Sequence, residues 1–376
     1  MRVLVVSHSA AMGGAERAIA RTVELLVARG HNVQVTVPAD GPLSALLRAV
    51  GLAADDIVVL PTHRWVSPRA RRPAGVARIV QCLADVPSHV RFQRRLRPDV
   101  VVVNTLTIPA PLVAARLAGV PLVTIAREAV RTNPVMATFF PRAWVLWAVR
   151  RLSTLVVAVS HFVATQVGVD RVVLEHVRAD AVASVARLAP SAPFRAVMIG
   201  AITPDKGQID AARATADARD RGADVQLSVY GTGRRQDVDA LRQEIESLVL
   251  GEHVLLRGEV PAAPEVLEGA DLLVMASRNE GFGRVTVEAL QMGVPVLAYD
   301  CGGTREALRE GGGMLVPPHP APLGDALYRL ATTPDEWQRL RTEASIAGRI
   351  WSQSTTDQEL VDVIESVAAA RREAGR

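Results

Sequence analysis

The chain of 376 residues is poor in the residues that build disulfide frameworks, metal sites and membrane spans. Its two cysteines, Cys82 and Cys301, are too few for a disulfide framework and are typical of a reducing compartment. The longest stretch without a charge, residues 152–169, contains serine, histidine and glutamine, which favours a buried strand and the next helix over a membrane span. The apolar run after Arg2 is four residues long, too short for a signal peptide, so we expect a cytoplasmic protein.

Lysine is almost absent, and the sequence shows no cluster of carboxylates. Of the 43 basic residues, 42 are arginine, and Lys206 is the single lysine. Because Lys206 lies in a turn flanked by glycines, we interpret it as a position that needs a compact ammonium group rather than a guanidinium fork. Without clustered carboxylates we expect neither a metal ion nor a cofactor.

Negative charge is scarce in the first half of the chain. Residues 1–186 carry 22 basic and 11 acidic side chains, a formal charge of +11. Residues 187–376 carry 21 basic and 28 acidic side chains, a formal charge of −7. The N-terminal half is therefore expected to meet an anionic partner.

The sequence does contain repeated alternation of apolar strand patterns with helical patterns, which predicts an α/β fold with parallel, doubly wound sheets. We expect an N-terminal domain at 1–187 and a C-terminal domain at 188–355, because two prolines at 190 and 193 bracket the entry to a new strand. The expected strands are residues 2–7, 31–38, 56–60, 100–104, 121–125, 154–159, 195–200, 225–230, 253–256, 272–276 and 294–299.

The stretch 271–293 carries the strongest indication of function. Its first residues predict a buried strand, Gly281 and Gly283 allow a tight turn, and a helix is expected from Arg284 to a left-handed cap at Gly293. A glycine turn followed by a helix start presents backbone N–H groups to an anion, and phosphate is the natural candidate.

Two carboxylates flank this expected anion site. Glu280 precedes the helix, and Glu288 lies about 6 Å further along the helix axis. Carboxylates repel phosphate, so an anion held between them on the amides needs neutral hydroxyl groups on either side. A nucleotide diphosphate sugar has this layout, with sugar hydroxyls, a diphosphate and ribose hydroxyls in order.

The residues E-G-F-G at 280–283 are followed by E-A-L, by G-V-P-V and by Gly302-Gly303-Thr304-Arg305-Glu306. This pattern resembles the paired-glutamate signature of the retaining glycosyltransferases of family 4. The resemblance implies the GT-B fold, in which two Rossmann-like domains face a cleft, and a C-terminal helix at 356–376 that crosses back to the N-terminal domain. It further implies that Glu280 addresses the donor sugar and Glu288 the ribose. The implied contacts of the diphosphate are the backbone amides of Gly281, Phe282, Gly283, Arg284 and Val285.

The same resemblance assigns roles to glycine turns elsewhere. The G-G-A-E loop after the first strand approaches the donor diphosphate and the acceptor, and Lys206 binds the diphosphate. A glycine turn after the strand 225–230 closes on the donor, and the backbone that follows the strand 253–256 reads the nucleotide base. The residues implied are Gly13, Gly14, Lys206, Gly231, Gly258 and Val260.

Two positions depart from the family pattern. Ala201 stands where relatives carry an arginine that binds the diphosphate. Arg127 and Glu128 stand where many relatives have a histidine that reaches the donor sugar. Either Arg127 or Glu128 takes over that hydrogen bond, or the donor pocket is arranged differently, and these alternatives stay open. The candidate catalytic residues are therefore Glu280, Lys206, Arg127 and Glu128.

Aromatic residues make up only 4% of the chain, yet two phenylalanines and two tryptophans fall within residues 139–151 beside three arginines. The proline of this stretch predicts a helix start. One side of that helix would be formed by Phe140, Trp144, Trp147 and Arg151. Such a helix either lies in the headgroup layer of an anionic membrane or packs in the first domain with its arginines in solvent. The first alternative predicts attachment to the inner face of the plasma membrane.

These observations predict a metal-independent retaining glycosyltransferase that moves a hexose from a UDP- or GDP-sugar to an acceptor. The expected acceptor is a glycan, either lipid-linked or part of a growing cell-surface polysaccharide, and no nucleic acid is expected as a partner. Another GT-B activity, such as a nucleotide-sugar epimerase, and a non-catalytic nucleotide-sugar-binding protein are the alternatives.

Overall fold

The computed structural model describes residues 1–66, 73–132, 137–178, 189–190, 192–259 and 262–374. These residues form two units, one of residues 1–176 and 355–376 and the other of residues 177–354. The second unit begins at Val177, earlier than the expected boundary at residue 188. The carbonyl oxygen of Val177 accepts a hydrogen bond from Nε2 of Gln291 at 2.8 Å, which attaches this segment to the second unit.

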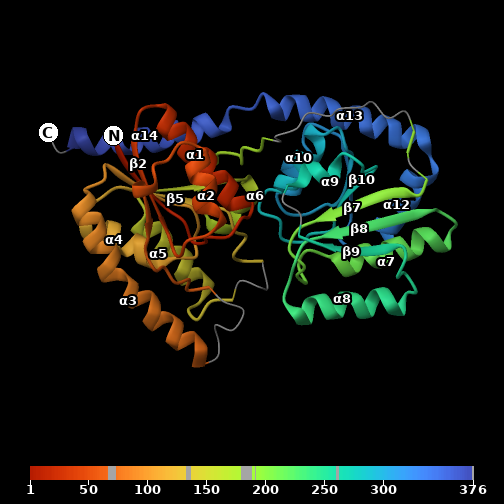
Figure 1. Ribbon diagram of the computed structural model, residues 1–376, viewed down its shortest axis with the longest axis horizontal. Coiled ribbons are helices and arrows are strands. Elements are labelled where there is room, and N and C mark those ends of the chain that lie inside the picture. Colours follow the sequence, from red (N-terminus) through yellow and green to blue (C-terminus); the bar gives the residue numbers. More distant parts are fainter. Residues whose placement is uncertain (67–72, 133–136, 179–188, 191, 260–261, 375–376) are drawn as a thin grey trace. The chain divides into compact units, whose positions relative to one another are not determined.

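Unit 1 contains a six-stranded parallel sheet in the order β3-β2-β1-β4-β5-β6. Two of its strands, β2 and β5, are labelled in Figure 1. Strands β1 and β4 consist of apolar residues with no exposed surface at Val3 to Val6 and at Val100 to Val103, as expected for strands covered on both faces. The strands are β1 (Arg2–Val6), β2 (Asn32–Val37), β3 (Ile57–Val59), β4 (Val100–Val103), β5 (Leu122–Ala126) and β6 (Leu155–Ala158). The helices are α1 (Gly14–Ala28), α2 (Pro42–Ala49), the short 3-10 helix η1 (Ala54–Asp56), α3 (Pro73–Leu96), α4 (Pro109–Ala118), α5 (Arg142–Leu152) and α6 (His161–Val167).

The last helix of the chain, α14 (Thr356–Ala374), belongs to unit 1. It packs along α1. Asp357 accepts a hydrogen bond from Nε of Arg21 at 2.9 Å, and Arg372 pairs with Asp99 at 2.7 Å. These ion pairs fix the helix at both of its ends.

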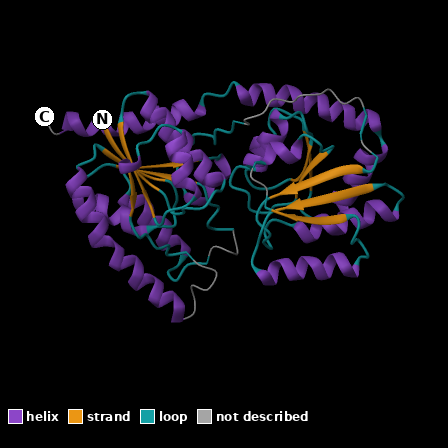
Figure 2. Ribbon diagram, viewed as in Figure 1, coloured by secondary structure: helices purple, strands orange, loops and turns teal. Residues whose placement is uncertain are grey.

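Unit 2 repeats this topology, with a parallel sheet in the order β12-β11-β10-β7-β8-β9. Among its helices, α7 packs on α8 and α12, α10 packs on α9 and α13, and α12 also contacts α13. Figure 2 shows the sheet of each unit enclosed by helices. The strands are β7 (Phe194–Ile199), β8 (Val225–Tyr230), β9 (Val254–Gly258), β10 (Leu272–Met275), β11 (Val296–Tyr299) and β12 (Gly313–Val316). The helices are α7 (Gln208–Asp220), α8 (Arg235–Ser247), α9 (Ala263–Leu267), α10 (Arg284–Gln291), α11 (Thr304–Ala307), α12 (Pro320–Thr332) and α13 (Pro334–Ser352).

The expected fold class, two doubly wound parallel sheets, is confirmed. In each sheet the first and fourth strands of the unit are neighbours, β1 with β4 and β7 with β10. The strand order reverses between these two strands, and ligands of such sheets bind outside the carboxyl ends of the strands at this point. The residues that follow β7 and β10 are therefore the first place to look for a site in unit 2.

Candidate active site

Lys206 and Glu280 meet at the switch point of the sheet of unit 2. Lys206 follows β7 and Glu280 follows β10, and Nζ of Lys206 lies 2.5 Å from Oε2 of Glu280. The two side chains keep 28% and 17% of their surface exposed, so the pair is accessible to a ligand. Two residues selected from separate sequence motifs thus form one ion pair.

Burial acts to lower the pKa of Lys206, but the neighbouring Glu280 carboxylate outweighs burial and, with Asp205, holds the pKa above the usual lysine value. The ammonium group therefore stays charged at neutral pH. A fixed positive charge at the carboxyl edge of the sheet is suited to a diphosphate.

The loop that carries Lys206 rests directly on the end of β10. Gly207 has a φ of +77°, and a Cβ atom there would lie 2.2 Å from the carbonyl oxygen of Ala276. The amide of Arg278 donates to the carbonyl of Asp205 at 2.9 Å. Only glycine permits this approach, so the glycine beside Lys206 fixes the position of the ammonium group relative to Glu280.

The glycine turn between Glu280 and α10 packs against the backbone of Gly302 and Gly303. The amide of Gly303 donates to the carbonyl of Glu280 at 2.8 Å, and a Cβ atom on Gly303 would lie 2.2 Å from the carbonyl oxygen of Gly281. Gly283 caps α10 with a φ of +91° and supplies no side-chain acceptor to the first-turn amides. The helix start expected from the sequence is confirmed, as is the left-handed Gly293, with a φ of +67°.

Phe282, assigned to the donor by its backbone, has its side chain in the core. It is 3% exposed and makes an edge-on contact with the ring of Trp351 at 5.6 Å between centroids. The ring therefore anchors the turn, which leaves the backbone on either side of it in a fixed position.

Glu288 is not a solvated helix position. Its side chain is 12% exposed, and its Oε1 lies 3.9 Å from a terminal nitrogen of Arg284, one turn earlier in α10. Burial lowers the pKa of Arg284, and Glu288 opposes this effect. Arg284 and Glu288 thus form a largely buried pair at the start of the helix.

Sequence reasoning missed two buried hydroxyl groups beside the glycine turn. Thr286 is fully buried and Thr304 is 1% exposed, and neither hydroxyl oxygen has a hydrogen-bond partner among the described residues. A Cβ atom on Gly283 would lie 3.2 Å from the Thr286 hydroxyl and 3.4 Å from that of Thr304. Buried hydroxyls without partners are uncommon in native proteins, and here both lie next to the expected anion position.

The other two glycines predicted to bind the donor, Gly231 and Gly258, are joined by a backbone hydrogen bond. The amide of Gly231 donates to the carbonyl of Gly258 at 2.6 Å, and Gly231, with a φ of +144°, lies directly against the backbone of Gly200. Ala201 is exposed in the adjoining loop. Val260 lies outside the described residues, so its assigned contact with the base stays a prediction.

In unit 1, Gly13 precedes α1 at the end of the loop that follows β1, and Gly14 is the first helical residue. A Cβ atom on Gly13 would lie 2.7 Å from Oε2 of Glu16, a glutamate that is only 5% exposed and whose pKa is raised by burial. Oε1 of Glu16 lies 3.7 Å from Nε2 of His8. Burial, followed by the charges of Arg64 and Arg127, lowers the pKa of His8 to about 3, so this histidine is neutral.

Arg127 and Glu128 belong to the same edge of unit 1 and are held by neighbouring side chains. Arg127 donates to Oδ1 of Asn104 at 2.8 Å and forms an ion pair with Glu175. The carboxylate of Glu128 accepts hydrogen bonds from the hydroxyl of Thr105, from the amide of Leu106 and from the amide of Arg127. The structure therefore gives both residues a role in ordering the loop after β4, and their catalytic assignment stays a prediction.

Among the described residues no group of three or more histidine, cysteine, aspartate or glutamate side chains is arranged to hold a metal ion. The sequence has one D-x-D triplet, residues 237–239, on α8. Asp237 pairs with Arg234 at 2.7 Å, and Asp239 lies 3.5 Å from Arg235. Nor does any helix among the described residues have the length and apolar composition needed to cross a membrane.

Two family models match this chain, one in each half. Residues 12–175 match the model of the family described as Glycosyltransferase Family 4, and residues 184–346 match that described as Glycosyl transferases group 1.

Three relatives illustrate the range of similarity. The 2-deoxystreptamine glucosyltransferase of Streptomyces kanamyceticus is 31% identical over 288 residues, 66% of this chain and 72% of that protein. The phosphatidyl-myo-inositol mannosyltransferase of Mycobacterium leprae is 27% identical over 95% of this chain and 94% of that protein. The D-inositol 3-phosphate glycosyltransferase of Nocardia farcinica is 35% identical over 49% of this chain, a match that spans 42% of that protein.

Solved structures share the fold. The Anabaena protein HepE in complex with UDP-glucose has a TM-score of 0.74 at 22% identity, with 97% of this chain and all of that chain covered. Sucrose-phosphate synthase from Thermosynechococcus elongatus also has a TM-score of 0.74, at 15% identity over 98% of this chain and all of that chain.

Proposed function

The chain belongs to the glycosyltransferases of family 4, and we propose that it transfers a hexose from a nucleotide diphosphate sugar to an acceptor with retention of configuration and without a metal ion. The observation that carries this proposal is the Lys206–Glu280 pair, 2.5 Å apart at the switch point and beside the start of α10. A cation beside a carboxylate is suited to the point where the diphosphate and the sugar of such a donor meet.

When the donor binds, Lys206 and Glu280 exchange their contact with each other for contacts with the donor. Lys206 contacts the diphosphate and offsets the charge that develops as the sugar leaves, and the amides at the start of α10 act on the same oxygens. Glu280 accepts hydrogen bonds from the sugar hydroxyls. The hydroxyls of Thr286 and Thr304, unpaired among the described residues, supply two more donors at the turn. In a retaining transfer of this type the departing phosphate acts as the base, and the protein provides position and charge.

The test of this proposal is a panel of UDP- and GDP-sugars assayed for donor hydrolysis and for transfer. One donor is expected to be hydrolysed slowly without acceptor, and the product of transfer is expected to keep the anomeric configuration of the donor, as measured by NMR. Binding of nucleotide sugars without turnover of any of them would favour a non-catalytic protein, and inversion of the sugar carbon without transfer would favour an epimerase.

For the acceptor we propose a phosphate-bearing or lipid-linked glycan met at unit 1. Two relatives are named for inositol phosphate or phosphatidylinositol acceptors. The half of the chain that forms most of unit 1 carries the formal charge of +11. At the carboxyl edge of its sheet, Arg64 donates to the carbonyl of His8 at 3.4 Å, and burial lowers its pKa. A buried guanidinium gains from an anionic ligand because the ligand compensates its lost hydration.

The aromatic face of α5 supports attachment to an anionic membrane from the cytoplasmic side. Phe140, Trp144 and Trp147 form a row with centroid distances of 4.4 and 6.4 Å. Trp144 and Trp147 are 43% and 53% exposed, although tryptophan side chains are mostly buried in folded proteins. Exposed tryptophans beside arginines are suited to the headgroup layer of a bilayer.

Vesicle binding is therefore expected to rise with the content of anionic lipid, to fall with salt, and to drop about tenfold in a Trp144→Ala, Trp147→Ala variant. Cosedimentation with vesicles measures it. The matched control is Ile346→Ala with Ile350→Ala, which removes two similarly exposed apolar side chains from α13. Indifference of the parent protein to anionic vesicles at low salt would instead indicate a soluble acceptor.

A further inference from the structure

A pocket of about 500 Å³ opens at the amino edge of the sheet of unit 1, away from the residues discussed so far. Pro121 in its wall directly precedes β5, whereas Arg127 follows the other end of that strand. Five strand residues separate the two positions, a length of about 16 Å. The pocket is therefore distinct from the candidate active site residues of unit 1, and its volume is typical of a small-molecule site.

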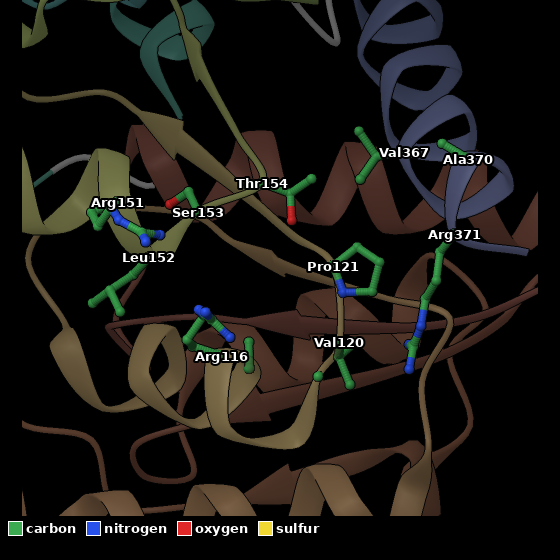
Figure 3. A pocket seen from close by; sticks show the side chains of 12 residues that line it. Arg116, Val120, Pro121, Arg151, Leu152, Ser153, Thr154, Val367, Ala370 and Arg371 are labelled. Atoms are coloured by element: carbon green, nitrogen blue, oxygen red, sulfur yellow. The ribbon is translucent and has the colours of Figure 1, made fainter. Parts of the chain in front are cut away.

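Three arginines from three different helices line this pocket. Arg116 lies in the last turn of α4, Arg151 in the last turn of α5, and Arg371 in the last turn of α14. Figure 3 shows Arg116 and Arg151 on one side of the pocket and Arg371 on the other. None of its twelve lining residues is acidic. Within the described part of the chain, Arg116 and Arg151 have no ion-pair partner, and Arg371 donates only to the carbonyl of Pro98 at 3.3 Å.

Helix dipoles explain only part of this arrangement. A cation in the last turn of a helix is favourable by roughly 0.3 to 1 kcal/mol, and each of the three arginines occupies such a place. That effect does not require three helices to place arginines along the wall of one pocket, where like charges repel one another. An anion in the pocket would reduce this repulsion.

The wall of the pocket also offers a hydroxyl donor. Oγ1 of Thr154 accepts a hydrogen bond from the amide of Leu122 at 3.0 Å, which leaves its own proton available to donate. Guanidinium groups bind phosphate oxygens in a bidentate manner, and a hydroxyl completes such a site. From the three arginines, the threonine and the absence of acids in the wall, we propose that this pocket binds a phosphate group.

The helix that contributes Arg151 indicates the source of that phosphate. Trp147 lies one turn before Arg151 on α5, so the two side chains share a face of the helix. Because Trp147 is 53% exposed, an indole that enters a headgroup layer brings Arg151 to the depth of the lipid phosphates. The pocket therefore takes the phosphate of an anionic lipid headgroup, an assignment that rests on the proposed membrane attachment through α5 but not on the transfer reaction.

The test compares two triple variants of the full chain with the same loss of charge. Arg116→Gln, Arg151→Gln and Arg371→Gln removes the pocket cations, and Arg48→Gln, Arg91→Gln and Arg95→Gln removes three exposed arginines elsewhere in unit 1. Cosedimentation is measured with vesicles of phosphatidylcholine alone and of equal parts phosphatidylcholine and phosphatidic acid. Titration calorimetry with inorganic phosphate and with glycerol 3-phosphate measures the binding of soluble phosphates. Thermal unfolding checks that both variants fold, and Arg116→Gln alone repeats the measurements with the smallest change.

The pocket variant is expected to bind phosphatidic acid vesicles at least about tenfold more weakly than the parent protein, equivalent to about 1.4 kcal/mol, and the control variant within about twofold. Vesicle binding without measurable binding of the soluble phosphates identifies the lipid headgroup as the source. Binding of glycerol 3-phosphate that the pocket variant alone loses supports the phosphate site and identifies a soluble ligand instead. Equal losses in both triple variants, or no binding of either probe class by the parent, would overturn the proposal.

Discussion

Lys206→Ala is expected to lower kcat/KM for the preferred donor by an amount equivalent to about 2 to 4 kcal/mol of transition-state stabilisation, the scale of losing a preorganised charge contact. Lys206 is the single lysine of the chain, and Ala201 stands where the family pattern has a second cation. No other basic side chain is therefore assigned to the diphosphate in the loop after β7. Steady-state kinetics over a range of donor concentrations measures the effect.

Because the neighbouring Glu280 holds the pKa of Lys206 above its usual value, Lys206→Ala should lower kcat/KM by the same factor at mildly acidic and mildly basic pH. Arg235→Ala, at an arginine 95% exposed on α8, is the control for a general effect of charge in unit 2. Ala201→Arg is expected to strengthen donor binding by restoring the missing cation. Near full activity of Lys206→Ala on every donor that the parent protein uses would refute the assignment.

The sequence was sufficient to predict the architecture, because parallel strands covered on both faces are continuous apolar runs. Val3 to Val6 and Val100 to Val103 show no polar residue, and all of the strands expected from such runs are present. The strand β12 was missed since Gly311, Gly312 and Gly313 hide its short apolar run. The second unit begins at Val177, eleven residues before the predicted boundary, and the hydrogen bond from Gln291 to Val177 is a contact that no local pattern indicates.

The same distinction applies to the candidate site. The glycine turn was predicted from a local motif, whereas the pairing of Lys206 with Glu280 depends on the strand order, which brings the ends of β7 and β10 side by side. The hydroxyls of Thr286 and Thr304, which have no hydrogen-bond partner among the described residues, were not predicted, because their burial depends on packing around Gly283. Nor do motifs show that Arg127 and Glu128 are engaged by Asn104 and Thr105.

The pocket at the amino edge of unit 1 shows what sequence patterns cannot indicate. Arg116, Arg151 and Arg371 are separated by more of the chain than any motif spans, and each alone is an ordinary arginine at a helix end. Their presence in one pocket depends on the packing of α14 within unit 1. Charge patterning indicated only that the N-terminal half meets an anion.

Substitutions of the two glutamates of the motif are expected to change different kinetic constants. Glu280→Gln should lower kcat about 100-fold with a small change in KM, because its contact with the sugar strengthens as charge develops in the transition state. Glu288→Gln should mainly raise KM for the donor and Kd for the free nucleotide, about tenfold, because hydrogen bonds to the ribose are alike in ground and transition states. Steady-state kinetics and titration with the nucleoside diphosphate separate the two.

The structure adds a condition to this comparison. Glu288 lies 3.9 Å from Arg284, whose pKa is lowered by burial, so Glu288→Gln removes a counter-charge as well as a ligand contact. Thermal unfolding of each variant is therefore measured first, with Glu343→Gln, at an exposed glutamate of α13, as the control. In Glu280→Gln the loss of turnover should persist at saturating donor, whereas high donor concentration should restore most of the activity of Glu288→Gln. Equal and small effects of the two changes on kcat and KM would mean that the glutamates do not bracket a diphosphate.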